Sequence, residues 1–154
     1  MSNSCLTPSA IASVIAVVAC CASFGAHAEL GGTMPSQAVA GASAPRTLLN
    51  GALRERTWTD AGNTTINEYA TSTGLIVAYA WQGPTMPDLH ALLGKYGDSY
   101  KTGAAAAAGS GNLHSSRVSR SDVIVESGGP MRGYVGRGWL PAALPAGVSS
   151  DDIQ

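Results

Sequence analysis

Two histidines outside the N-terminal segment, His90 and His114, are the residues best suited to catalysis. Ser115 and Ser116 follow His114 directly, and Asp122 lies a few residues further on. A serine, histidine and aspartate site can be drawn from these residues, but such a site is defined by geometry rather than by coexistence in a sequence. The G-x-S-x-G motif that exposes a nucleophilic serine is absent from the sequence. A small secreted hydrolase using His90 or His114 is therefore kept as the alternative to a non-enzymatic role.

The sequence contains no recognisable pattern for a metal or a cofactor. Asp151 and Asp152 form an isolated acidic pair that is expected to be solvated, without the histidines or further carboxylates that a metal site requires. The glycines at 128–138 lack the Lys-Ser/Thr pair of a phosphate-binding loop. Neither a cofactor nor a metal is expected.

Arginine and aromatic residues occur together near the C-terminal end, where a strand is predicted at 131–139. Arg, Tyr and Trp are the side chains that most often anchor protein interfaces. They predict an interaction surface, and Glu126 could alternatively form only a weak cross-strand ion pair with the first arginine. The predicted surface consists of Arg132, Tyr134, Arg137 and Trp139.

The composition excludes one class of function. The net charge is −1 and only 12% of residues are charged. A nucleic-acid-binding protein would show a basic stripe, which this sequence lacks. With 154 residues the chain is long enough for one domain.

Residues 1–28 have the features of an export signal. An apolar run at 11–25 precedes an A-x-A motif that ends at Ala28, which predicts cleavage after Ala28. Two features depart from this pattern: no Lys or Arg precedes Arg46, and Cys20 ends a stretch similar to a lipoprotein signal. A surface lipoprotein anchored through Cys20 is therefore the alternative to a periplasmic or secreted protein.

All three cysteines lie within this segment, so the mature chain is predicted to be free of cysteine and of disulfides. The apolar run at 11–25 is too short to span a bilayer comfortably. No transmembrane helix is expected in the mature chain.

The stretch Gly74–Leu93 is expected to organise the fold. Its first half is apolar on both sides of an extended chain, which predicts an interior strand with Leu75, Val77, Tyr79 and Trp81 on one face. Pro84 ends the strand. Pro87 and Asp88 then open a helix whose apolar stripe has helical spacing. The stripe consists of Leu89, Leu92, Leu93, Tyr96 and Tyr100.

The flanking segments predict an α+β domain with an antiparallel sheet of about five strands, in the order β-β-β-α-β-β, and one helix on a face. Strands are expected at 53–60, which is interpreted as an edge strand, and at 64–71, 74–81, 117–127 and 131–139. Residues 29–50 are interpreted as a flexible N-terminal arm. The domain is placed at 51–154, with a Gly/Ala linker at 103–112.

Several motifs are distributed over the mature chain: Glu29–Ser36, Trp81–Pro84, Pro87–Leu89, Leu92–Gly94, Val125–Gly129, Met131–Arg132, Gly136–Arg137, Trp139–Pro141 and Gly147–Val148. Together they resemble an uncharacterised family of small exported proteins of Gram-negative bacteria, domain of unknown function 2844. The resemblance covers the mature chain and implies export and a single domain, with no catalytic residue to transfer.

These observations favour an exported, non-enzymatic accessory domain that binds another exported protein or an envelope component.

Overall fold

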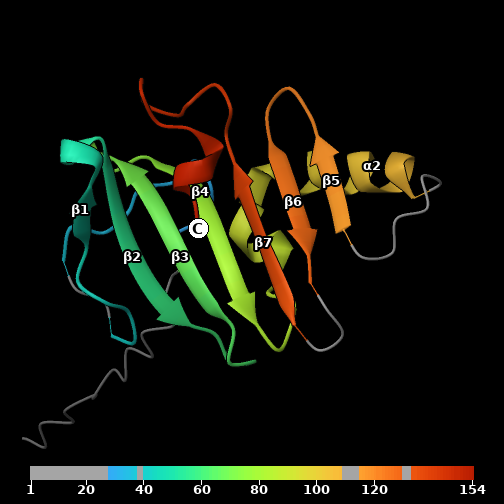
Figure 1. The fold of residues 1–154 in the computed structure, drawn as a ribbon, viewed down its shortest axis with the longest axis horizontal. Coiled ribbons are helices and arrows are strands. Elements are labelled where there is room, and N and C mark those ends of the chain that lie inside the picture. The colour runs from blue at the N-terminus through green and yellow to red at the C-terminus, as the bar shows by residue number, and fades with distance from the viewer. Residues whose placement is uncertain (1–27, 38–39, 109–114, 130–132) are drawn as a thin grey trace, which may run out of the picture.

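A computed structural model describes residues 28–37, 40–108, 115–129 and 133–154. Within these residues the protein is an α+β domain built on one antiparallel sheet with the strand order β1-β2-β3-β4-β7-β6-β5 (Figure 1). The helical segment lies behind the sheet in this view, and the C-terminal segment lies in front of it. The predicted class, with a helix packed on an antiparallel sheet, is confirmed.

The strands and helices follow one another in the chain as follows. The described elements are β1 (Arg46–Leu48), β2 (Leu53–Thr59), β3 (Thr65–Thr71), β4 (Ile76–Gly83), α1 (Leu89–Leu93), α2 (Gly97–Ala107), β5 (Ser115–Ser119), β6 (Ile124–Gly128) and β7 (Tyr134–Trp139), with short 3-10 turns at Leu49–Gly51, Gly94–Tyr96 and Ser150–Asp152.

The predicted meander of three strands is present as β2, β3 and β4, and its tight turns have clear local causes. In the first turn the Asp60 carboxylate accepts hydrogen bonds from the backbone N–H groups of Gly62 and Thr64, at 2.8 and 2.9 Å. This is the local bonding that favours aspartate at the start of a turn. In the second turn Gly74 has a φ of +92°, a conformation that suits glycine.

The prediction of five strands was wrong, because the described residues form seven. The strand expected at 117–127 is a hairpin: β5 and β6 are antiparallel partners, and Arg120 N–H bonds to the Val123 carbonyl oxygen at 2.9 Å in the turn between them. The turn at 120–123 contains neither glycine nor proline, so its only turn-forming residues are Ser121 and Asp122. The other additional strand, β1, lies within the predicted N-terminal arm.

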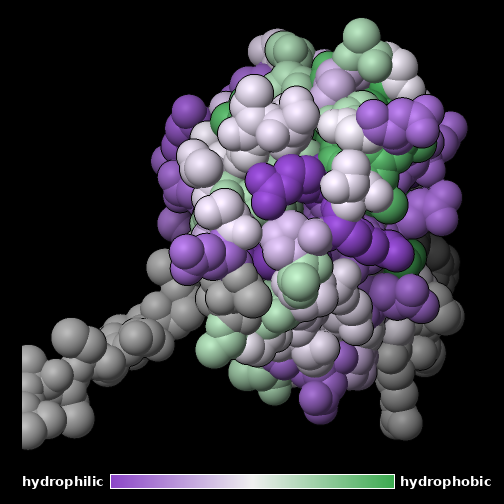
Figure 2. Space-filling view, turned by 90° about the vertical axis from the view of Figure 1, so that its left-hand side faces the viewer, coloured by the Kyte–Doolittle hydropathy of each residue, from purple (hydrophilic) through white to green (hydrophobic). Residues whose placement is uncertain are grey.

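The interpretation of residues 53–60 as an edge strand was also wrong. β1 pairs with the first half of β2, and Ala42 and Ser43 bond to its second half. The actual edge is β1, which has only three residues. Figure 2 looks onto this side of the molecule and shows hydrophilic side chains across its middle. A short, polar edge resists pairing with a further strand.

The helical segment begins as predicted and is then divided into two parts. Asp88 caps α1, with its carboxylate accepting from the N–H groups of His90 and Ala91 at 3.0 and 3.1 Å. Gly94, at a φ of +50°, caps the end of α1 and is the first residue of the 3-10 turn that leads into α2. The Gly/Ala linker predicted at 103–112 begins inside α2, which continues through Ala107; residues 109–112 lie outside the described part.

Strand β4 is buried on both faces, as predicted for an interior strand. Every residue from Ile76 to Trp81 is at most 4% exposed. The register shifts opposite Tyr69 and Ala70, so that Ile76 faces the same side as Tyr79 and Trp81. The predicted placement of Val77 on that side was wrong, because a bulge adds one residue and reverses the alternation.

The helix face of the sheet carries the larger core. The predicted stripe packs here, with Leu92 and Leu93 buried and Leu89, Tyr96 and Tyr100 partly buried against the same cluster. The N-terminal segment adds Leu30 and Met34, which are 0% and 2% exposed. Backbone bonds fix this segment: Leu30 N–H donates to the Leu92 carbonyl oxygen, and Gly31 N–H to that of Ile76. The sequence analysis missed both of these core side chains.

The opposite side, here called the tail face, is partly covered by the residues after β7. Ile153 is 1% exposed and packs in a second cluster with Tyr69, Ala78 and Trp139. The Tyr69 hydroxyl donates to the Gln154 carbonyl oxygen at 2.5 Å, which ties the last described residue to β3. Burial raises the pKa of Tyr69 to about 12, so this donor stays protonated at physiological pH. The C-terminal segment is therefore an integral layer of the domain.

An ion pair is enclosed between the sheet and the helix-face core. Arg56 Nη2 lies 2.9 Å from Glu68 Oε1, and the two side chains are 1% and 0% exposed. The Tyr79 hydroxyl donates to Glu68 Oε2 at 2.9 Å, and the Arg56 guanidinium lies 5.7 Å from the Trp58 ring centre. Burial raises the pKa of Glu68, while Arg56 and Tyr79 oppose that shift by stabilising the carboxylate. Each charge depends on the other, because a buried charge without its partner is very costly.

We therefore expect Arg56→Met to lower the free energy of unfolding by about 3–5 kcal/mol, since it leaves the Glu68 carboxylate buried without its cation. Replacing both partners, as Arg56→Met with Glu68→Leu, should recover most of that loss. Urea unfolding monitored by tryptophan fluorescence measures all three chains.

The matched control is Arg117→Met, which removes an arginine that is 60% exposed in its pair with Glu126. That change should cost less than about 1 kcal/mol. An Arg56→Met protein no less stable than the Arg117→Met protein would contradict the assignment.

Candidate functional site

The tail face is covered only in part, and the uncovered part contains a groove of about 760 Å³. This volume lies within the range of ligand-binding sites. The groove lies over β3, β4, β7, β6 and β5, and Ile153 and Gln154 of the C-terminal segment close one side. We call it the tail-face groove.

The strand register explains the shape of this groove. Two rows of side chains run across the five strands. The main chain between the two rows also lines the groove, at Trp81, Gly136, Ser127 and Ser116. Because neighbouring strands are about 4.8 Å apart, the rows are about 19 Å long. One row consists of Asn67, Ala80, Arg137, Glu126 and Arg117, and the other of Thr65, Gln82, Val135, Gly128 and Ser115.

Gly136 has a second role on the opposite side of the sheet. A Cβ at this position would overlap the Trp81 indole and the Glu126 carbonyl oxygen. The absence of a side chain therefore lets the indole of Trp81 lie across β7 on the helix face. This close approach explains one of the glycines that the sequence placed along the last strand.

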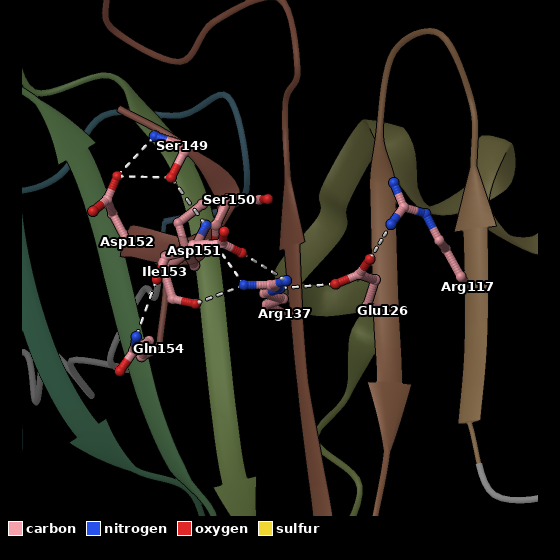
Figure 3. Close-up of polar contacts among 9 residues, drawn as sticks. All are labelled: Arg117, Glu126, Arg137, Ser149, Ser150, Asp151, Asp152, Ile153 and Gln154. Carbon is pink, nitrogen blue, oxygen red and sulfur yellow. Dashed lines mark hydrogen bonds and ion pairs between the residues drawn. The ribbon is translucent and has the colours of Figure 1, made fainter. Parts of the chain in front are cut away.

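A ladder of three charged residues forms the end of the first row that reaches β5 (Figure 3). Glu126 on β6 accepts from Arg137 Nε on β7 at 2.8 Å, and its other oxygen accepts from Arg117 on β5. The three side chains lie directly opposite one another in the register. Two arginines and one glutamate give the ladder a net charge of +1, with the more exposed arginine at the β5 end.

Arg137 also holds the C-terminal segment in place. Its Nη1 donates to the Ser150 carbonyl oxygen at 2.5 Å, and its Nη2 lies 3.7 Å from the Asp151 carboxylate (Figure 3). The guanidinium lies 5.4 Å from the Trp139 ring centre. One planar guanidinium thus joins β6, β7 and the C-terminal segment, a role that its fixed donor geometry suits.

The structure brings together only some of the residues of the predicted interaction surface. Arg137 and Trp139 share the tail face, but Trp139 is only 4% exposed and belongs to the core. Tyr134 is 42% exposed and lies on the helix face, because it is an odd number of residues from Arg137. Arg132 lies outside the described residues. The ion pair suggested between Glu126 and Arg132 falls there too, and the described partners of Glu126 are Arg117 and Arg137.

The sequence analysis missed most of the groove, including Arg117, Asn67 and Gln82. Alternation along each strand placed polar side chains on one face, and this was the only available signal. Which polar residues meet across strands depends on the register, and the strand at 117–127 was not recognised as a hairpin.

The residues considered for hydrolase chemistry do not assemble in the described parts of the chain. Asp122 accepts from Ser99 Oγ of α2 at 2.8 Å, which ties the helix to the β5–β6 turn. His90 lies on α1, and its imidazole carbon Cδ2 faces Gly97. His114 lies outside the described residues.

Residues 26–153 match a family described as protein of unknown function, DUF2844. The chain belongs to this family. The resemblance stated from the sequence motifs is thereby confirmed. Neither the curated proteins nor the solved structures contain a match to the DUF2844 chain.

Within the described residues of the DUF2844 chain, no helix combines the length and apolar character needed to cross a membrane. In the same residues, no three His, Cys, Asp or Glu side chains are grouped in a way that could hold a metal ion.

Arg137→Lys should loosen the C-terminal segment of the DUF2844 chain, because an ammonium cannot bond to Glu126 and Ser150 as the guanidinium does. A hydrogen bond to a charged group contributes about 1.5–3 kcal/mol. We therefore expect the Ile153 and Gln154 amides to exchange with solvent at least about tenfold faster, as measured by NMR.

Arg117→Lys is the control, since Arg117 pairs with the same glutamate from β5, at the end of the ladder opposite Arg137. It should leave the exchange of these two amides unchanged. Equal exchange rates in the Arg137→Lys and unaltered chains would contradict the proposed clamp.

Proposed function

We propose that this chain is an exported binding domain without catalytic activity, and that the tail-face groove is its ligand site. The observation that carries the proposal is the groove itself: a depression across five strands, about 19 Å by strand spacing, with a largely apolar lining, several polar side chains and a rigid floor of sheet main chain. Sites built on strands hold their side chains more precisely than sites on loops.

The groove has the chemistry of recognition by hydrogen bonds. Its walls offer amides from Asn67 and Gln82, hydroxyls from Thr65 and Ser115, and the guanidinium of Arg117. Val135, which is 48% exposed, adds an apolar contact in the middle of the second row. A few polar groups around an apolar contact are typical of ligand sites. The backbone groups of the inner strands are paired within the sheet, so side chains supply the specificity.

The shape favours an extended ligand that crosses the strands. The two rows run at right angles to the strand direction, so a chain-like ligand would contact five strands in turn. The arginine at the β5 end would suit an anionic group on that ligand. Another exported protein and an envelope component are the two partner classes that the proposal includes.

Export is the other part of the proposal. It is supported by the apolar run at 11–25 and the A-x-A motif ending at Ala28. The proposed location is periplasmic or secreted, and lipid attachment at Cys20 is the alternative. The intact mass of the protein isolated from the producing bacterium distinguishes cleavage after Ala28 from a lipid-modified chain that begins at Cys20.

The groove is tested by filling it. Val135→Trp places an indole in the middle of the second row, and Tyr134→Trp places the same indole on the opposite face at a residue of similar exposure, 42% against 48%. We expect the protein to sediment with envelope fractions of the producing bacterium, and Val135→Trp to weaken that binding at least about tenfold, or about 1.4 kcal/mol. The Tyr134→Trp protein should bind as the unaltered chain does.

Treating the fractions separately with protease and with glycan hydrolases identifies the partner class. The proposal fails if the unaltered protein binds neither envelope proteins nor envelope glycans, or if both tryptophan variants bind equally well.

A further inference from the structure

The hydroxyl of Tyr79 faces two hydrogen-bond acceptors. It lies 2.9 Å from Glu68 Oε2, and it also contacts the carbonyl oxygen of Ala28. A phenol carries one proton and can donate one strong hydrogen bond at a time. While Glu68 is ionised, one of these two oxygens is therefore left without its donor.

The position of this carbonyl group is fixed by the residues that follow it. Leu30 is fully buried, and its N–H donates to the Leu92 carbonyl oxygen at 2.8 Å. Gly31 N–H donates to the Ile76 carbonyl oxygen at 2.9 Å. Ala28 itself packs against the helix-face core. The peptide bond between Ala28 and Glu29 is thus held against Tyr79 by the arm and the sheet together.

The nitrogen of Glu29 lies close to the same hydroxyl. A peptide nitrogen and oxygen are bonded to one carbon and are separated by roughly 2.3 Å. A group that replaced the Ala28 carbonyl and donated from this nitrogen would reach the Tyr79 oxygen with little movement. An ammonium group has three donors and no acceptor, so it is complementary to the phenol oxygen.

We propose that the α-ammonium group of Glu29, released by cleavage after Ala28, is the native partner of the Tyr79 hydroxyl and the final member of the buried network. The ammonium donates to Tyr79, Tyr79 donates to Glu68, and Glu68 remains paired with Arg56. The Tyr79 hydroxyl then donates one hydrogen bond and accepts one. The inference rests on the proposed export, because it requires cleavage at this bond.

The reaction is a hydrolysis by a peptidase of the signal-removing class. Water adds across the Ala28–Glu29 amide bond, so that the carbonyl carbon leaves as the carboxylate of the released peptide. The nitrogen of Glu29 keeps its electron pair and becomes an ammonium at neutral pH. Because the folded sheet covers this bond in part, cleavage is expected before folding is complete.

Each element packed against the new terminus contributes a charged or titratable side chain. Arg56 lies on β2, Glu68 on β3 and Tyr79 on β4, while Lys95 and Tyr96 of the 3-10 turn approach Gly31. The carboxylate of Glu29 itself faces Gly94. The ammonium therefore enters a site that contains two carboxylates and two other cations, and its contact with the Tyr79–Glu68 pair is the most deeply buried.

Two chains that differ by one residue test the inference: one begins at Glu29 and the other at Ala28. Every buried member of the two core clusters is Leu30 or a later residue, so both of these chains contain the complete buried core. We expect the chain beginning at Glu29 to unfold at a higher urea concentration at pH 6.5, although it has lost the packing of Ala28. Tyr79→Phe and Glu68→Gln should each abolish this difference.

The titration of the α-ammonium is the second measurement, made on unaltered protein. Its hydrogen bond to the Tyr79 oxygen and the nearby carboxylates of Glu68 and Glu29 favour the charged form, and should raise its pKa above the ordinary value of roughly 7.7. If the pKa of the ammonium is higher in the folded than in the unfolded chain, the ammonium stabilises the folded chain fully below about pH 7.7. This stabilisation is lost as the pH rises through the pKa of the folded chain. The advantage of the chain beginning at Glu29 should therefore disappear in alkaline solution.

The inference is overturned if the chain beginning at Ala28 is as stable as the shorter chain, or if the α-ammonium titrates at its ordinary pKa. A persistent difference in the Tyr79→Phe chains would also overturn it. The intact mass of the natural protein is a separate result: a terminus other than Glu29 refutes the proposed cleavage, whereas the two comparisons above test the contact itself.

Discussion

The domain depends on one strand that excludes water from both of its faces. Six consecutive residues of β4 are buried, and this requires a covering layer on each side of the sheet. The helical segment and the N-terminal residues supply one layer, and the residues after β7 supply the other. Because the N-terminal residues contribute to one layer and the C-terminal residues form the other, β4 links segments that are distant in sequence. A sheet with one bare apolar face would not be stable alone.

Polar residues lie on both sides of this strand and have different roles. On the helix face, Arg56, Glu68 and Tyr79 form a buried network in which Glu68 pairs with Arg56 and accepts from Tyr79, while Arg56 Nε and Nη1 have no hydrogen-bond partner among the described residues. On the tail face, Arg137 connects the ladder to the C-terminal segment and lies at the border of the area that this segment covers. Beyond it the same ladder continues into the open groove through Glu126 and Arg117. The binding site that we propose is therefore the part of the tail face that the chain does not cover itself.

Local patterns predicted the centre of the fold, and long-range pairing accounts for what they missed. Alternation and turn residues placed β2, β3 and β4, and helical spacing identified Leu92 and Leu93. The hairpin of β5 and β6 was missed because its turn lacks glycine and proline. Leu30 and Met34 were missed because single apolar residues in a small-residue segment have no period. The ladder could not be predicted from the sequence, because Glu126 and Arg137 are brought together by the register of β6 and β7, two strands that flank a loop.

Amide hydrogen exchange in β4 tests most directly whether this strand is the interior of the domain. Tyr79, Ala80 and Trp81 lie between β3 and β7 and beneath both covering layers. We predict that their amides exchange only through global unfolding, with the free energy of exchange equal to that from urea denaturation. Exchange of these amides as fast as that of the β1 edge strand, at Arg46–Leu48, would contradict the account.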